Sequence, residues 1–191
     1  MSVGSAILIF ILILGILSIF LMLSLYNGLV SLRQQVIRAW SNIDVILKQR
    51  HDEIPQLIKI IEQFTQYERA TIDRVVQARQ AYLNARSIPE KIGASKETSQ
   101  ALNGILAIGE AYPELKSNAQ FVQLQTRISA LEGTLADRRE NYNESATNFN
   151  TKIMQIPSNF MANMLGYTEC PMYTVEREEK TMPSLSLDLP K

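Results

Sequence analysis

The chain has 191 residues, with 19 basic and 19 acidic side chains and a formal net charge of zero. That balance argues against nucleic-acid binding, which normally needs a clustered excess of basic residues. A single cysteine, Cys170, excludes an internal disulfide and a cysteine-rich metal site.

The N-terminal region is strongly apolar. The first 32 residues contain no charged side chain, and residues 6–25 are almost unbroken Ile, Leu, Phe and Ala. Such a helix extends roughly 30 Å, the thickness of the hydrocarbon core of a bilayer. A buried helix of a soluble protein seldom runs so long without a polar face, and the features of a cleavable signal peptide are missing. The sequence therefore predicts a transmembrane anchor over residues 1–25.

Positive charge follows the anchor but does not precede it. Arg33, Arg38, Lys48 and Arg50 lie within about twenty residues of its C-terminal end. The positive-inside rule then places the N-terminus outside and the following domain in the cytoplasm. A domain on the outer side is the alternative, because Arg33 already lies well beyond the apolar stretch.

Behind the anchor, apolar residues recur every three or four positions, which predicts amphipathic helices. The first seam covers residues 29–50, and the pattern then breaks at residues 51–55. Asp52 is a good N-cap, and Pro55 would fall in the first turn of a new helix. We expect a tight turn here, with one long helix kinked at Pro55 as the alternative. A second helix is predicted over residues 53–86.

The remaining pattern is also helical. Residues 87–95, with Pro89 and Gly93, are typical of a loop. A third helix is predicted over residues 96–112 and a fourth over residues 121–156, ended by Pro113 and Pro157. No stretch alternates like a strand. The predicted fold class is all-α, with an N-terminal transmembrane helix followed by an antiparallel four-helix bundle over residues 26–157.

The C-terminal segment, residues 158–191, differs from the bundle in composition. Methionines and aromatic residues gather between residues 154 and 173, and flexible thioethers suit adaptable contacts. They either cap the bundle's own core or contact a second molecule. Beyond Thr168, three prolines and a charged run predict an extended, poorly ordered tail. The candidate oligomer contacts are Met154, Phe160, Met161, Met164, Leu165 and Met172.

Several charged residues lie on or beside the apolar seams. A charge buried in a bundle must be paired or hydrogen-bonded, so they predict a buried polar clasp that fixes helix alignment. A binding groove for a partner helix is the alternative. The residues are Asp44, Arg50, Glu68, Arg79, Arg138 and Arg139.

Catalytic signals are weak. Nucleophilic catalysis needs a nucleophile beside a base, whereas the one histidine, His51, and Cys170 belong to different predicted elements. We interpret His51 as structural, at the C-terminal end of a helix whose dipole favours an imidazolium. No zinc-protease, P-loop or dinucleotide-binding motif is present. We therefore expect no enzyme, catalytic residue, metal, cofactor or small-molecule substrate.

Six segments resemble the signature of the LemA family, which comprises bacterial proteins with an N-terminal membrane helix and a helical bundle. They read YNGLVSLR (26–33), AWSNIDVILKQRHDEIP (39–55), EAYPELK (110–116), RENYN (139–143), FN (149–150) and IPSN (156–159). Two positions depart from the family pattern: Tyr67 precedes Glu68 where His-Glu is usual, and Ile156 precedes Pro157 where Phe is usual. The first departure weakens any metal or proton-transfer role at that position.

The resemblance implies architecture and membrane attachment, because the family's biochemical role is poorly defined. A relative in magnetotactic bacteria is associated with building an organelle membrane, and family genes often neighbour a membrane metalloprotease. We expect a single-pass protein of the bacterial cytoplasmic (inner) membrane that acts by binding, as a scaffold or assembly subunit. Its expected partners are the lipid bilayer and further copies of the chain. The alternative is an adaptor or regulator of a membrane protease or an envelope signalling system.

Overall fold

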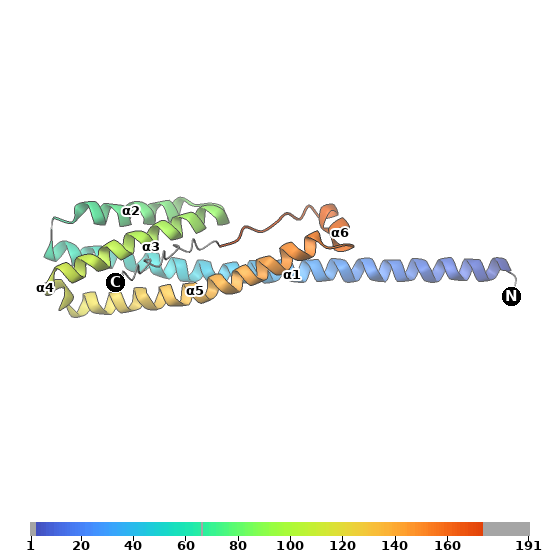
Figure 1. Cartoon of the computed structure of the whole chain (residues 1–191), viewed down its shortest axis with the longest axis horizontal. Helices are drawn as coiled ribbons and strands as arrows, with labels where there is room; N and C mark the ends of the chain where they lie inside the picture. The colour runs from blue at the N-terminus through green and yellow to red at the C-terminus, as the bar shows by residue number, and fades with distance from the viewer. Residues whose placement is uncertain (1–2, 66, 174–191) are drawn as a thin grey trace, which may run out of the picture.

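The computed structural model describes residues 3–65 and 67–173. Within them lie helices and no strand, which confirms the predicted all-α class. The longest helix, α1, runs the full length of an elongated molecule, and the other helices gather around its C-terminal half (Figure 1). The helices are α1 (Val3–Phe64), α2 (Arg69–Asn84), α3 (Ile88–Ala111), α4 (Pro113–Lys116), α5 (Ala119–Met154) and α6 (Ser158–Met164).

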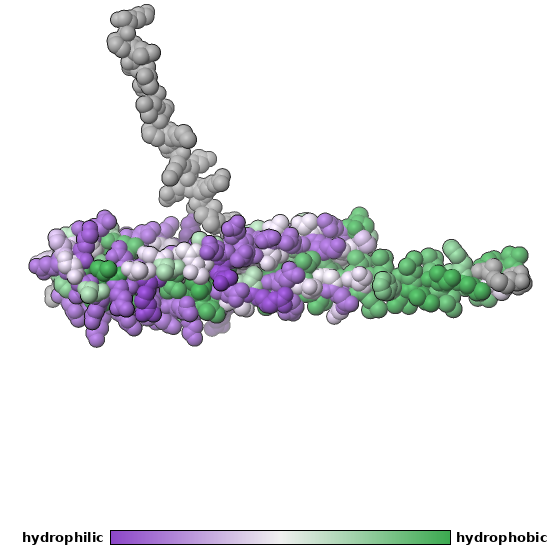
Figure 2. Space-filling model, turned by 90° about the horizontal axis from the view of Figure 1, so that it is seen from below, coloured by the Kyte–Doolittle hydropathy of each residue, from purple (hydrophilic) through white to green (hydrophobic). Residues whose placement is uncertain are grey.

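The N-terminal part of α1 stands free of the bundle. Its large apolar side chains between Ile7 and Leu23 each expose half or more of their surface, and full burial begins only at Leu29. Figure 2 shows this free part as a continuous apolar surface beside a mostly polar bundle. The helix is long and apolar enough to cross a bilayer. Unpacked apolar surface of this length is suited to lipid rather than water, so α1 serves as a membrane anchor.

The predicted turn near His51 is wrong, because α1 continues through Pro55 to Phe64 as one helix. The helix ends at Phe64, and the Thr65 hydroxyl oxygen accepts a hydrogen bond from the amide of Tyr67 at 3.2 Å. The helix predicted over residues 53–86 is therefore divided between α1 and α2. Burial explains the continuity: Ile54 and Leu57, on either side of Pro55, are both fully buried and hold this stretch against the core.

The loop predicted over residues 87–95 is also wrong, because α3 begins at Ile88. Ser87 is its N-cap: the Ser87 hydroxyl accepts from the amide of Glu90, and the Glu90 carboxylate accepts from the amide of Ser87. This reciprocal capping box satisfies two amides that a helix start otherwise leaves unpaired. Pro89 fits because the first helical turn needs no amide donor at that position.

The four long helical segments pack together only in the part of the molecule remote from the free helix. There, α2 and α3 form a hairpin against α1 and α5, and the Tyr82 hydroxyl near the end of α2 donates to Asp44 of α1. Nearer the anchor, α1 and α5 continue as an antiparallel pair covered by α6 and the residues after it (Figure 1). The buried side chains of that half include Leu29, Ile43, Tyr142 and Phe149.

Candidate functional site

A buried arginine joins three helices in the middle of the bundle. Arg50 of α1 is completely buried and forms an ion pair with Glu132 of α5. Its Nη1 also donates to the Ser99 hydroxyl at 2.8 Å, and its Nη2 donates to the carbonyl and hydroxyl oxygens of Ser95 at 3.2 and 3.1 Å. Both serines belong to α3. The ion pair and the hydrogen bonds of Arg50 thus hold α1, α3 and α5 in one alignment.

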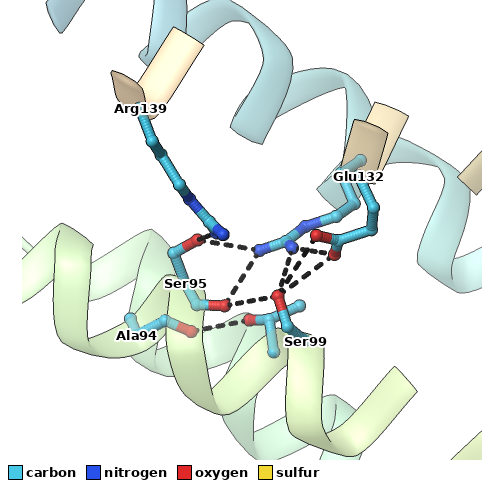
Figure 3. A network of polar contacts seen from close by, with 7 residues as sticks. Ala94, Ser95, Ser99, Glu132 and Arg139 are labelled. Atoms are coloured by element: carbon cyan, nitrogen blue, oxygen red, sulfur yellow. Dashed lines mark hydrogen bonds and ion pairs between the residues drawn. The ribbon is translucent and has the colours of Figure 1, made fainter. Parts of the chain in front are cut away.

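Arg139 extends this group toward the C-terminal part of the chain. Its Nη2 donates to the Ser95 hydroxyl at 3.2 Å, and its guanidinium lies 4.5 Å from the centre of the Tyr173 ring. Figure 3 shows Glu132 directed at Ser99 and Arg139 directed at Ser95. We call Arg50, Ser95, Ser99, Glu132 and Arg139 the polar network.

Arg79 explains how α1 tolerates Pro55. Proline lacks the amide that would bond to the carbonyl four residues earlier, so the His51 carbonyl loses its partner within the helix. The Nε of Arg79, on α2, donates to that carbonyl oxygen at 3.1 Å. A side chain from a neighbouring helix therefore replaces the missing backbone bond.

His51 lies in the interior beside this contact. Its ring stacks on that of Tyr82 with centroids 3.9 Å apart. Burial, together with the nearby charges of Arg50 and Arg79, lowers the pKa of His51 to about 3, so the ring is neutral near pH 7. The expected imidazolium at a helix end is therefore wrong, since α1 does not end there. Burial and the neighbouring Asp44 carboxylate raise the pKa of Tyr82.

The six predicted clasp residues do not form one group. Arg50, Arg79 and Arg139 lie in the middle of the bundle, where Asp44 also accepts from Tyr82 and forms an ion pair with Lys91 at 2.6 Å. Glu68 lies apart, at the α1–α2 break, and accepts from the Tyr112 hydroxyl at 3.3 Å. Arg138 is exposed, because it lies about 100° around α5 from Arg139.

Three residues of the polar network, Ser95, Ser99 and Glu132, were not predicted from the sequence. Ser95 and Ser99 carried a usable signal, since two small polar residues four apart share one helix face. Glu132 carried none, because an acidic residue on an amphipathic helix normally indicates a solvated face.

Loss of Arg79 should destabilise the protein through the His51 carbonyl. We expect Arg79→Met to lower the free energy of unfolding by about 1–3 kcal/mol, the cost of leaving a buried acceptor unsatisfied. In a Pro55→Ala background the backbone bond is restored, so the same change should cost about 1 kcal/mol less. Urea unfolding of all four chains in detergent, followed by circular dichroism, measures this coupling. Equal costs in both backgrounds would show that Arg79 acts elsewhere.

A second ordered site lies where residues 167–173, which we call the C-terminal strap, run extended along α5. Asn150 binds Cys170 with both ends of its amide: Nδ2 donates to the Cys170 carbonyl at 2.9 Å, and Oδ1 accepts from the Cys170 amide at 2.8 Å. Asn143 binds the carbonyl and amide of Tyr173 in the same way, at 2.9 and 2.7 Å. The two asparagines lie seven residues apart on one helix face and pair with the strap as a neighbouring strand would.

Between these contacts, the Tyr142 hydroxyl donates to the Pro171 carbonyl at 2.7 Å. Burial raises the pKa of Tyr142 to about 12 and also raises that of the Cys170 thiol. Tyr173 is only 4% exposed. The tail predicted beyond Thr168 is thus extended but firmly held as far as Tyr173, and its remainder lies outside the described residues.

The six predicted oligomer contacts fall into a buried or partly buried group and an exposed group. Met161 is buried in the bundle's own core and Leu165 packs partly against that core. The other four are exposed, with exposed fractions of 61% for Met154, 69% for Phe160, 72% for Met164 and 38% for Met172. The segment therefore caps the core and also presents apolar side chains outward.

A free apolar helix continuous with a helical bundle, locked by a buried polar network, defines a membrane-anchored helical protein. The sequence model of the LemA family matches residues 39–187, and the chain belongs to this family. Protein LemA of Metamycoplasma hominis is 26% identical over 155 residues, which are 81% of this chain and 71% of that protein.

Magnetosome proteins are also similar to this chain. MamQ 2 of Paramagnetospirillum magneticum is 32% identical over 76 residues, and MamQ of Magnetospirillum gryphiswaldense is 30% identical over the same length. Each match covers 40% of this chain but only 28% of the magnetosome protein. The chain thus spans little more than a quarter of these relatives.

Proposed function

We propose that the chain is a non-catalytic scaffold of the bacterial inner membrane, which acts through contacts between copies of itself with its bundle in the cytoplasm. The observation that carries this proposal is the continuity of α1 from the free apolar part to the far end of the bundle. A continuous helix transmits the orientation of the anchor to the bundle. Copies in one membrane would then present the same faces to one another.

Confinement to a membrane makes weak lateral contacts effective, because it raises the local concentration of each face. Exposed apolar side chains are available on the flank of α1, where Ile37 and Val45 expose 47% and 56% of their surface. A catalytic role finds less support: His51 is buried against Tyr82, whereas Cys170 lies in the strap beside Asn150.

The copy number of the full chain tests the scaffold proposal. We expect light scattering in mild detergent to give the mass of a homo-oligomer, and Val45→Glu to lower that mass by placing a charge in an apolar contact. Val122→Glu, at an exposed apolar position on α5, is the matched control and should leave the mass unchanged. A monomer that assembles only when another membrane protein is added would contradict the scaffold and favour the adaptor.

Orientation is tested separately with single cysteines in a Cys170→Ser background. Because Cys170 is half-buried with a raised pKa, an exposed position reports more directly. With the bundle in the cytoplasm, Val122→Cys should react with a membrane-impermeant maleimide only after lysis. Gly4→Cys, on the other side of the anchor, should react in intact cells whose outer membrane is permeable. The reverse pattern would place the bundle outside.

A further inference from the structure

We propose that the end of the bundle binds the membrane surface through an apolar patch formed by Met154, Ile156, Phe160 and Met164. This inference rests on the anchoring part of the proposed function and not on assembly between copies. The occupant is the headgroup region of the leaflet from which α1 emerges. The patch would be a second attachment to the bilayer beside the anchor itself.

The register of α1 and α5 places this patch at the end of the anchor. Arg50 of α1 pairs with Glu132 of α5. Ten residues nearer the anchor on α1, Trp40 packs on Tyr142, which lies ten residues further along α5 than Glu132. Continuing the same register brings Ile153 level with Leu29, and both belong to one buried cluster. The next residues, 154–156, which complete α5 and follow it, therefore lie level with residues 26–28, directly after the apolar stretch that ends at Leu25.

The patch is apolar and outward-facing. Ile156 is 79% exposed, Phe160 69% and Met164 72%, and the last two lie four residues apart on one face of α6. The opposite face of α6 is used inside the bundle, where Met161 and Ala162 are buried. Figure 2 shows apolar surface at the end of the bundle that adjoins the free part of α1.

The distribution of charge along the molecule also places the membrane boundary at the end of the anchor. Residues 1–32 and 153–168 contain no charged side chain, and these two uncharged stretches meet at the end of the anchor. The first charges on the bundle side include Arg33, which lies 4.6 Å from the centre of the Tyr167 ring, and Lys152, in the last turn of α5. Aromatic and basic side chains just beyond an apolar stretch are typical of a headgroup boundary.

A free amphipathic helix usually needs many basic residues to reach a membrane, and α6 has none. Here the anchor already holds α6 at the bilayer, so burial of apolar surface needs no electrostatic recruitment. A second copy of the chain is the competing occupant. It would have to cover a patch that the register places at the level of the lipid.

The test uses the full chain with Cys170→Ser in phosphatidylcholine vesicles. A polarity-sensitive fluorophore is attached at Phe160→Cys, and in matched chains at Val122→Cys, an exposed apolar position at the far end of the bundle, and at Leu14→Cys in the anchor. We expect doxyl groups near the lipid headgroups to quench the fluorophore at position 160 and aqueous iodide to quench it poorly. At position 122 we expect aqueous iodide to quench the fluorophore strongly and doxyl lipid to quench it poorly.

Quenching at position 160 by iodide and not by doxyl lipid would overturn the proposal. Protection from both quenchers, lost when the chain is diluted into excess empty lipid, would also overturn it and would assign the patch to a second copy. Deep doxyl groups must quench position 14; if they do not, the anchor itself is wrong and the proposed function fails with it. Should labelling at position 160 reduce the helical content, Met164→Cys supplies a second reporter on the same face.

Discussion

Replacing Arg50 by methionine should lower the free energy of unfolding by about 3 kcal/mol, the lower end of the cost of breaking a buried ion pair. Arg50 is completely buried, whereas Glu132 keeps 31% of its side chain exposed and can partly rehydrate. The change also removes the charged donor that Ser95 and Ser99 share. Urea unfolding of the full chain in detergent, followed by circular dichroism, measures the loss.

Two companion variants separate the buried pair from a general effect of charge. Arg138→Met removes an exposed arginine of the same helix that carries Glu132, and it should change stability by no more than about 0.5 kcal/mol. Adding Glu132→Leu to Arg50→Met removes the stranded carboxylate and should recover part of the loss. Equal losses for Arg50→Met and Arg138→Met would contradict the assignment of Arg50 to the polar network.

Replacing Asn150 by alanine should release the C-terminal strap locally. Two hydrogen bonds to the backbone of Cys170 are lost, and at about 1 kcal/mol each they correspond to a change of roughly 30-fold in the opening equilibrium. We therefore expect hydrogen exchange at the Cys170 amide to become faster by about that factor. Mass spectrometry of the peptides that contain the strap measures it.

The same measurement has a matched control on α5. Asn148→Ala removes an exposed asparagine two residues away and should leave the exchange rate of the strap unchanged. Asn143→Ala should instead accelerate exchange at the Tyr173 amide, to which Asn143 is bonded. If the Asn148→Ala and Asn150→Ala chains had the same hydrogen-exchange rate at the Cys170 amide, the strap would be held by side-chain packing alone.

Much of the architecture could be predicted because it depends on local composition and periodicity. The uncharged stretch of residues 1–32 indicated the anchor, and the three- and four-residue spacing indicated helices without strands. The C-terminal end of α5 was predicted to within two residues, at residue 156 where the helix ends at Met154, because Pro157 cannot continue a helix. The buried position of Arg50 followed from its place on an apolar seam.

The sequence by itself therefore determined the anchor, the all-α class and most of the buried faces, because each follows from neighbouring residues. Tertiary structure decided the rest. Pro55 would favour a helix end locally, but Arg79 from α2 bonds the carbonyl that Pro55 leaves free, so α1 continues. The strap is ordered because Asn143 and Asn150 supply the hydrogen bonds that an extended backbone cannot make to itself. Both outcomes depend on groups brought together from distant parts of the chain, and no local pattern specifies them.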